Sequence, residues 1–248
     1  DRTILVQSTT STKNSGLYDH ILPMVKQDTG VTVNVVAVGT GAAIKNAMNC
    51  DGDVLLVHSR KREDQFVAGG YSKKRYDLMY NDFVIVGPNG DPAGIDEMHD
   101  AVAALKKIAA TKSKFASRGD GSGTHGKERS LWKRTGVDQD ASSGSWYLET
   151  GSGMGATLNT AVGTEAYTLS DRASWAVHAN KSDFKIMVEG DKLLFNPYGV
   201  MLIDAGRCPS VNSDSGKAFI DWLISSKGQR TIASFRVSGK QMFFPNAQ

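Results

Sequence analysis

The residues with the clearest chemical pattern in this sequence are glycines, serines and threonines that gather in turns between an expected strand and an expected helix. N–H groups at a helix start have no partner within the helix and carry a positive partial charge, so such a turn can bind an anion. One such turn alone is most simply a cap, because Ser and Thr are common N-caps and Gly is a common turn residue. The pattern recurs at residues 8–12, 39–41, 118–124 and 151–155, and without glycine at 169–172. This repetition favours anion binding.

The richest of these turns contains an arginine, Arg118, with Asp120 two residues later. A guanidinium is permanently charged and offers donors in a fixed geometry, and a neighbouring carboxylate can hold it in place. Ser122, Gly123 and Thr124 would add hydroxyl and backbone N–H donors at the start of the next helix. We therefore predict a direct anion clamp at this turn; the alternative is a surface arginine in an ordinary salt bridge.

Two nucleotide-binding motifs are matched only in part. The dinucleotide pattern GxGxxG occurs at 121–126 and its GxGxxA variant at 151–156, but we expect neither to follow the strand that opens a Rossmann unit. The P-loop pattern GxxxxGK[ST] is approached at 121–128, where Glu128 replaces the required hydroxyl and would repel phosphate. The P-loop is therefore rejected, and an NAD(P)-dependent enzyme is a remote alternative.

Patterns for catalysis and for metal binding are weak. The serines lie in no GxSxG elbow, and the five histidines show neither HExxH nor paired spacing. His58-Ser59 and Thr124-His125 are neighbours only in sequence, so we expect these histidines to be structural. We predict no catalytic residues, no metal site and no cofactor, and hence a protein that is not an enzyme.

The composition is that of a folded globular protein of 248 residues, with 40% hydrophobic and 22% charged residues and a net charge of +3. This charge is too small for a dedicated nucleic-acid binder, and no apolar run approaches the ~20 residues of a membrane helix. We therefore expect a soluble chain that binds no nucleic acid. Because residue 1 is Asp rather than Met, we also expect a processed N-terminus.

The two cysteines, Cys50 and Cys208, show no metal-ligand spacing. They are either two reduced thiols in the core or one disulfide in an oxidising compartment, and the sequence leaves both states open.

Short β-rich runs alternate with helical stretches, which predicts an α/β fold with helices on both faces of a parallel sheet. Pro23 predicts a kink or break in the first helix, and the last forty residues are expected to be helical. The expected strands are 3–7, 31–38, 53–57, 114–117 and 166–169. The expected helices carry Leu17, Ile21 and Val25 on one face, begin at 42, cover 101–110, include 128–134 and cover 172–178.

Two segments, 77–87 and 193–203, are long for strands and carry polar residues in their middle. Such segments can cross between two lobes. We predict one lobe from 1–82 plus 197–248, a second lobe at 83–196, and two hinge crossings. In parallel sheets the polar turns lie at the carboxyl edge of the strands, where open α/β folds bind their ligands.

Nearly the whole chain resembles the tungstate-binding solute receptors of ABC transporters, within the type II periplasmic binding proteins. The first turn and the string after Ser117 are specific rather than generic. The segments that carry the resemblance are TTSTKNSGLYDHILP (9–23), AVGTG (37–41), DVLLVHSR (53–60), YNDFVIVGP (80–88), SRGDGSGTH (117–125), ETGSGMGATL (149–158), YTLSDRASW (167–175) and NPYGV (196–200).

The resemblance implies a two-lobed receptor, each lobe a mostly parallel sheet flanked by helices, that closes on one tetrahedral oxoanion and delivers it to a membrane permease. It implies a monomer in the periplasm, or tethered outside the cell, after removal of a signal peptide. The ligand residues that it implies are Thr9, Ser11, Thr40, Arg118, Ser122, Gly123, Thr124, Met154 and Ser170. Tungstate and molybdate are dianions of the same shape, so the preference for tungstate rests on the resemblance alone.

A phosphate or sulfate receptor of the same fold is the alternative, because the string from Arg118 to Thr124 also resembles phosphate receptors. Hydrogen phosphate carries a proton and therefore benefits from a carboxylate acceptor. Where phosphate receptors place that carboxylate, this chain has Val57-His58-Ser59, and Glu63-Asp64 follow only later. Tungstate or molybdate is therefore the favoured ligand.

Overall fold

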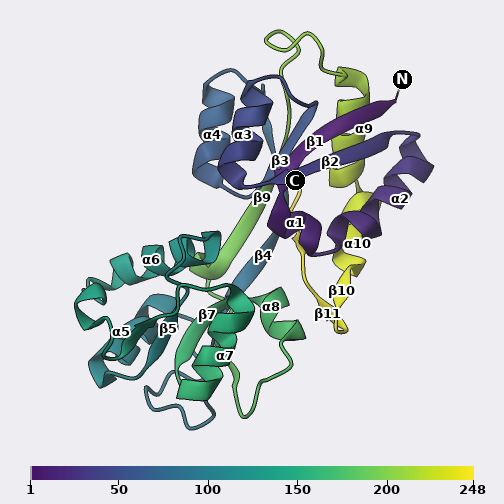
Figure 1. Cartoon of the computed structure of the whole chain (residues 1–248). Helices are drawn as coiled ribbons and strands as arrows, with labels where there is room; N and C mark the ends of the chain where they lie inside the picture. The colour runs from purple at the N-terminus through teal and green to yellow at the C-terminus, as the bar shows by residue number, and fades with distance from the viewer. Residues whose placement is uncertain (1) are drawn as a thin grey trace. The chain divides into compact units, whose positions relative to one another are not determined.

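The structure is a computed structural model in which residues 2–248 are described. The chain forms two compact units, which we call unit 1 (residues up to Asn81, with Asn196–Gln248) and unit 2 (Asp82–Phe195). The chain leaves unit 1 inside strand β4 (Arg75–Gly87) and returns at the start of strand β9 (Phe195–Leu202) (Figure 1). That the units act as two hinged lobes stays a prediction.

Unit 1 is built on the predicted β-α-β-α-β order. Strand β1 pairs in parallel with β2 and with β3, so the turns after these strands lie at one edge of the sheet. Helices α3 and α4 cover one face of the sheet, and α2, α9 and α10 lie on the other (Figure 1). The bounds are β1 Thr3–Thr9, α1 Thr10–Asn14, α2 Leu17–Thr29, β2 Thr32–Val38, α3 Thr40–Met48, β3 Val54–Val57, α4 Arg60–Ala68, α9 Ser213–Ile224, α10 Ser226–Ser234, β10 Arg236–Val237, β11 Lys240–Gln241 and β12 Phe244–Pro245.

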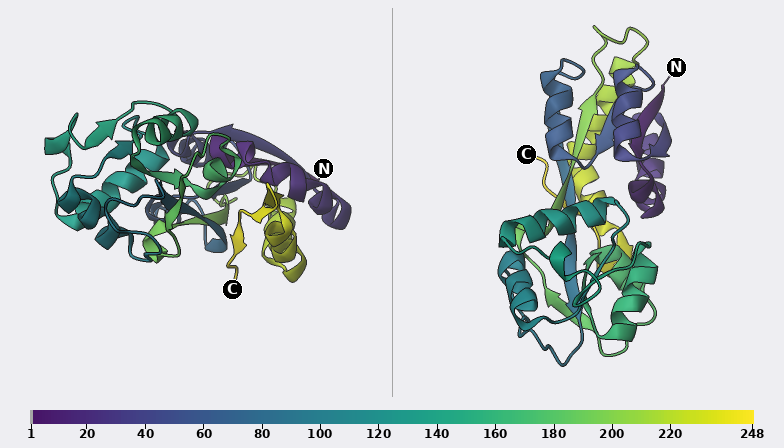
Figure 2. Two further views of the ribbon diagram at one scale, coloured as in Figure 1. Left: turned by 90° about the horizontal axis from the view of Figure 1, so that it is seen from below. Right: turned by 60° about the vertical axis from the view of Figure 1, so that its left-hand side comes forward.

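Unit 2 repeats this architecture on a smaller sheet, in which β5 pairs in parallel with β6 and β7. Helices α5 and α6 pack on one face around Phe115 and Trp132, and α7 packs on the other around Leu158 (Figures 1 and 2). The bounds are α5 Ala101–Thr111, β5 Phe115–Ser117, α6 Gly123–Thr135, η1 Asp140–Ser142, β6 Tyr147–Glu149, α7 Met154–Thr164, β7 Tyr167–Asp171, α8 Arg172–Val177, β8 Lys185–Val188 and η2 Lys192–Leu194.

The expected α/β fold class is confirmed, but the sheet is mixed rather than mostly parallel. Strand β9 runs antiparallel to β3, and β4 runs antiparallel to β7, β8 and β12. Strand direction depends on the end at which a connection enters the sheet, and hydrophobic periodicity does not record it.

Helix α2 continues through Pro23, where a kink or break was expected, so the helix is not broken there. Leu17, Ile21 and Val25 on its inner face are buried, and each contributes roughly 1.5–3 kcal/mol on burial. Together they outweigh the loss of about 3 kcal/mol that a proline causes inside a helix. The end of the chain is not all helical either, because three two-residue strands follow α10.

Cys50 and Cys208 form a disulfide with an S–S distance of 2.09 Å, which decides between the two states that the sequence left open. Both cysteines belong to unit 1, and all of unit 2 lies within the chain segment between them.

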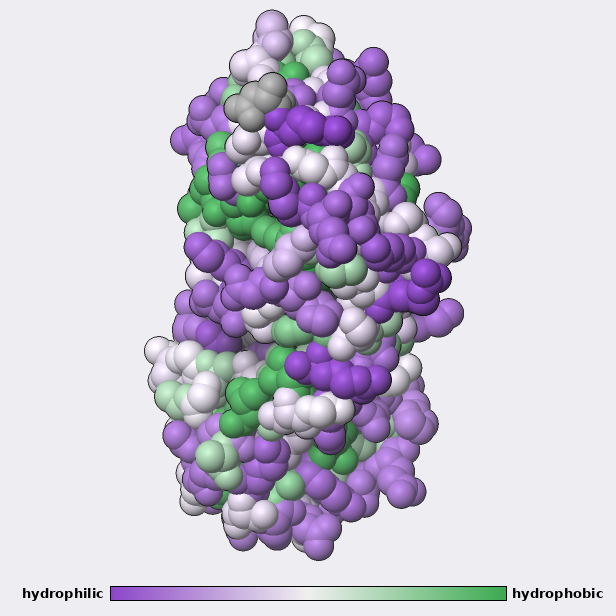
Figure 3. All heavy atoms as spheres, turned by 90° about the vertical axis from the view of Figure 1, so that its right-hand side faces the viewer, coloured by the Kyte–Doolittle hydropathy of each residue, from purple (hydrophilic) through white to green (hydrophobic). Residues whose placement is uncertain are grey.

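The described residues contain no helix long and apolar enough to cross a membrane. On the face drawn in Figure 3 hydrophilic residues predominate, and hydrophobic residues show in separate patches. Met48 and Val177 are the large hydrophobic side chains that the described part of the chain exposes.

Candidate anion-binding site

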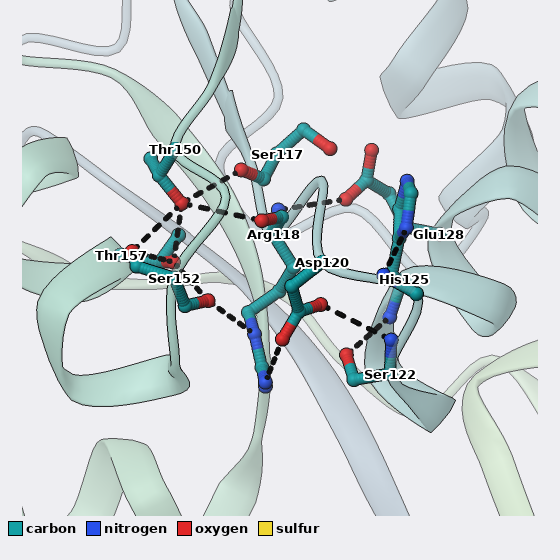
Figure 4. A network of polar contacts seen from close by, with 10 residues as sticks. Ser117, Arg118, Asp120, Ser122, His125, Glu128, Thr150, Ser152 and Thr157 are labelled. Carbon is teal, nitrogen blue, oxygen red and sulfur yellow. Dashed lines mark hydrogen bonds and ion pairs between the residues drawn. The ribbon is translucent and has the colours of Figure 1, made fainter.

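Arg118 lies at the carboxyl end of β5, and its guanidinium is held on two sides (Figure 4). Nε donates to the carbonyl oxygen of Ser152 at 2.9 Å, and Nη2 donates to Asp120 Oδ2 at 2.6 Å. No acceptor within residues 2–248 lies at hydrogen-bond distance from Nη1. The Arg118 side chain is only 13% exposed, so it offers a positioned charge with a free donor.

Asp120 holds the guanidinium as the sequence spacing predicts. Its second oxygen accepts the N–H of Ser122 at 3.1 Å. Burial alone would raise the pKa of Asp120, but hydrogen bonds from Ser122 and Arg118 outweigh it and lower the pKa below its usual value. The carboxylate is therefore ionised and is occupied by donors of its own turn.

The start of α6 provides the other donors of this turn. The Ser122 hydroxyl caps the helix by accepting the N–H of His125 at 3.2 Å. The N–H groups of Gly123 and Thr124 have no acceptor within the described chain, and the first helical turn contains no acidic residue. Gly121 adopts φ +74° and donates its N–H to His125 Nδ1 at 3.0 Å, so glycine is needed there for the turn itself.

The turn before α7 lies directly beside Arg118. Ser152 accepts from Arg118 Nε and donates its own N–H to the Arg118 carbonyl at 3.3 Å. Met154 is 8% exposed and its side chain packs in an apolar cluster, which leaves its backbone N–H, at the start of α7, as the group that it can offer to a ligand. The Ser170 hydroxyl is buried and donates to the Asp171 carbonyl at 2.9 Å, which leaves it no free hydrogen.

Both glycine-rich turns of unit 2 follow strands, β5 and β6. Strand β5 confirms the strand expected at 114–117, whereas no strand range was predicted at β6, because three residues are a weak signal for periodicity. The strand–turn–helix geometry therefore exists at both turns.

In unit 1, Thr9 and Ser11 come together at the carboxyl end of β1. Thr9 Oγ1 accepts the N–H of Thr12 at 3.3 Å as the N-cap of α1, and it lies 3.3 Å from Ser11 Oγ. Thr40 begins α3 at the end of the neighbouring strand β2. The Thr40 hydroxyl has no hydrogen-bond partner among the described residues, and the N-cap Gly39 leaves the first N–H groups of α3 uncapped.

His58 lies at the same edge of unit 1 as Thr9 and Ser11, although only a structural role was predicted for it. Its Nε2 lies 3.2 Å from Thr9 Oγ1 and 3.4 Å from Ser11 Oγ, and its ring packs against Tyr198. Burial lowers the pKa of His58, so the imidazole is neutral near pH 7. The position of His58 directly after β3 could have predicted its place beside Thr9, because the carboxyl ends of parallel strands lie at one edge of a sheet.

Glu128 is a second residue whose contacts with the turn were not predicted from the sequence. It is 2% exposed on α6 and accepts the N–H of Arg118 at 3.3 Å (Figure 4). It also accepts the hydroxyl of Tyr147 at 2.5 Å. Burial raises the pKa of Glu128 to about 7, against the opposing effect of hydrogen bonds from Tyr147 and Ser117. Its helical spacing to the buried Leu131 and Trp132 was the signal that it points inward.

Glu63 does not provide a free acceptor. It is fully buried and accepts from Arg75 Nε at 2.8 Å and from the N–H of Ser59. No group of three or more His, Cys, Asp or Glu residues in the described chain has the arrangement of a metal site. The turns of unit 2 thus present donors, and the carboxylates of Asp120 and Glu128 beside them are engaged by the protein, as is that of Glu63 in unit 1.

Comparisons with known proteins identify the family of the chain. Residues 1–227 match the family model described as a PBP superfamily domain. The tungstate-binding protein TupA of Peptoclostridium acidaminophilum is 43% identical, over 98% of this chain and 86% of that protein. A putative ABC transporter anion-binding protein of Haloferax volcanii is 43% identical, over 98% of this chain and 72% of that protein.

A solved structure, the tungstate-binding protein TupA from Desulfovibrio alaskensis G20, aligns over 100% of both chains with a TM-score of 0.95 and 44% identity. The resemblance seen in the sequence is therefore confirmed. The chain belongs to the PBP superfamily, in the family of the tungstate-binding proteins called TupA.

Proposed function

We propose that this protein binds tungstate as an oxoanion and passes it to the permease of an ABC transporter. The turn from Arg118 to Thr124 is the observation that carries the proposal. It presents a fixed guanidinium and the unpaired N–H groups of Gly123 and Thr124, while its carboxylate is already occupied. Family membership adds the ligand, since two relatives are named as tungstate-binding proteins.

Tungstate and molybdate are fully deprotonated dianions near neutral pH, so they require donors and are repelled by free carboxylates. Fixed dipoles in a site shielded from water stabilise such a charge effectively, even where formal charges do not balance it. We propose that Thr9, Ser11 and Thr40 of unit 1 bind the same anion as the donors of unit 2. Met154 would then contribute its backbone N–H rather than its side chain.

Phosphate is disfavoured by the arrangement of the carboxylates. A hydrogen phosphate ion needs an acceptor for its proton, but Glu63 is enclosed by Arg75 and Ser59, and Asp120 accepts from Arg118 and Ser122. The donor set therefore fits a fully deprotonated oxoanion better.

We further propose that the protein is a monomeric carrier in the periplasm, or tethered outside the cell, that releases its anion chemically unchanged. The disulfide between Cys50 and Cys208 supports an oxidising compartment, because such bonds persist mainly outside the cytosol.

Thermal unfolding with tungstate, molybdate, phosphate, sulfate and NAD⁺, each against sodium chloride of equal ionic strength, tests the ligand. A ligand at about 100 times its Kd adds about 2.7 kcal/mol to the free energy of unfolding, which visibly raises the midpoint. We expect tungstate and molybdate to raise this midpoint, and calorimetry will then rank the two affinities. A rise of the midpoint with phosphate or NAD⁺ alone would contradict the proposal. So would the absence of a rise with every anion.

A further inference from the structure

A buried carboxyl group lies directly behind the anion-binding turn. Glu128 Oε2 accepts the backbone N–H of Arg118, the residue that carries the guanidinium of the turn. Glu128 also belongs to α6, whose first residues Gly123 and Thr124 carry the free N–H donors. One side chain thus links the two groups of donors, and a change in its state acts on both.

The charges around Glu128 do not neutralise it. Arg118 in the turn is paired with Asp120, and Arg129 on α6 is paired with Asp140 in η1. His125 on α6 uses Nδ1 to accept from Gly121, and Tyr147 on β6 is held in its neutral form because burial raises its pKa. Within residues 2–248, Glu128 forms no ion pair. The charge of Arg129 lowers the pKa of Glu128, but this effect is small and burial outweighs it, so an ionised Glu128 leaves a largely uncompensated negative charge beside the turn.

Glu128 can accept a proton without leaving a neighbouring group unpaired, because the hydrogen bonds around it can rearrange. The Tyr147 hydroxyl lies 2.5 Å from Glu128 Oε1 and also 3.1 Å from Ser117 Oγ. When Glu128 is protonated, Tyr147 can donate to Ser117 and accept the new proton's hydrogen bond. The other oxygen of Glu128 still accepts the N–H of Arg118.

We propose that Glu128 is a positioning residue that couples oxoanion binding to the uptake of a proton. This inference rests on the proposed function. A dianion held by the turn repels the carboxylate and favours its protonated form, and by linkage the protonated form binds the dianion more tightly. The pKa of Glu128, about 7 in the free protein, places this exchange near neutral pH. Affinity should therefore be highest below this pKa and fall as the pH rises through it.

Isothermal titration of the full chain with sodium tungstate tests the coupling, between about pH 6 and about pH 8 in pairs of buffers with different protonation enthalpies. Phosphate buffers are avoided because phosphate is itself an oxoanion. We expect weaker binding at the higher pH, by up to about tenfold for each unit by which the anion raises the pKa of Glu128. We also expect a fractional proton uptake per tungstate.

Glu128→Gln identifies the group. Its amide can still accept from Arg118 and bond to Tyr147, but it cannot titrate, so binding should persist without proton uptake and with little dependence on pH. Glu165→Gln, at an exposed carboxylate of the same unit, should behave like the wild type. Proton uptake that survives in Glu128→Gln would assign it to another group, such as His125 or His58, and overturn the inference.

The remaining outcomes are also decisive. If the wild type binds tungstate with the same affinity across this range and takes up no proton, the inference fails and the proposed function stands. If the wild type binds no tungstate at any pH, both fail.

Should Glu128→Gln not fold, Tyr147→Phe provides a second test. It removes a hydrogen bond that lowers the pKa of Glu128, so the fall in affinity should move to higher pH. An unchanged profile in that variant would overturn the inference.

Discussion

Arg118 combines a permanent charge with a position that is fixed before any ligand arrives. Ser152 and Asp120 occupy Nε and Nη2, so the side chain loses little freedom when Nη1 meets an anion. The sequence predicted the pairing with Asp120 from spacing alone. It did not predict Ser152, because that contact joins two turns that are 34 residues apart in the chain.

Arg118→Ala should weaken tungstate binding by about 10- to 100-fold, the usual effect of losing a charge-assisted hydrogen bond. The loss also leaves Asp120 unpaired beside the anion, so the double variant Arg118→Ala/Asp120→Ala should recover part of the affinity. Isothermal titration measures both variants. Arg134→Ala, which removes an exposed arginine of helix α6 in the same unit, is the matched control and should bind like the wild type. An unchanged affinity in Arg118→Ala would remove this residue from the site.

Among the elements, β9 shows why one position in a strand must be glycine. A Cβ at Gly199 would overlap Glu63 Oε1 and come within 2.5 Å of Arg75 Nε. The Arg75 and Glu63 side chains are 7% and 0% exposed, so neither can move into solvent without separating a buried ion pair. Hydrophobic periodicity identified β9 as a strand but gave no sign of the ion pair packed against it.

Gly199→Ala should lower the free energy of unfolding by about 2–4 kcal/mol, through overpacking and disruption of the buried pair. Gly163→Ala in α7 is the control, because a Cβ there meets no atom within 4 Å. That change should instead stabilise the protein by about 0.5–1 kcal/mol, since alanine is the better helix former. Urea unfolding of both variants gives the comparison. Equal midpoints would show that the backbone near Gly199 relaxes freely.

For the molecule as a whole, the disulfide is the one covalent cross-link between distant parts of the chain within the described residues. It joins the segment after α3 to the segment after β9, both in unit 1, across 158 residues of sequence. Cross-linking such a long segment reduces the freedom of the unfolded chain, and the chain-entropy account predicts a large stabilisation for it.

Reduction of the disulfide, or the double variant Cys50→Ser/Cys208→Ser, should lower the free energy of unfolding by about 2–4 kcal/mol. Tungstate affinity should be retained, because Cys50 follows the far end of α3 from Thr40. Thermal unfolding with and without reductant measures the loss, and the double variant should not respond to reductant. A wild-type midpoint that is the same under both conditions would contradict a stabilising role.

The sequence by itself determined the α/β class, the parallel core of β1, β2 and β3, and the donor chemistry of the turn around Arg118. These features are local, since strands, helices and capping turns depend on residue types a few positions apart. Tertiary structure alone decided the antiparallel strands, the continuous helix through Pro23 and the paired cysteines. It also brought Glu128 behind Arg118 and His58 beside Thr9. Contacts of this second kind join residues distant in the chain, and they depend on packing and burial that no local pattern encodes.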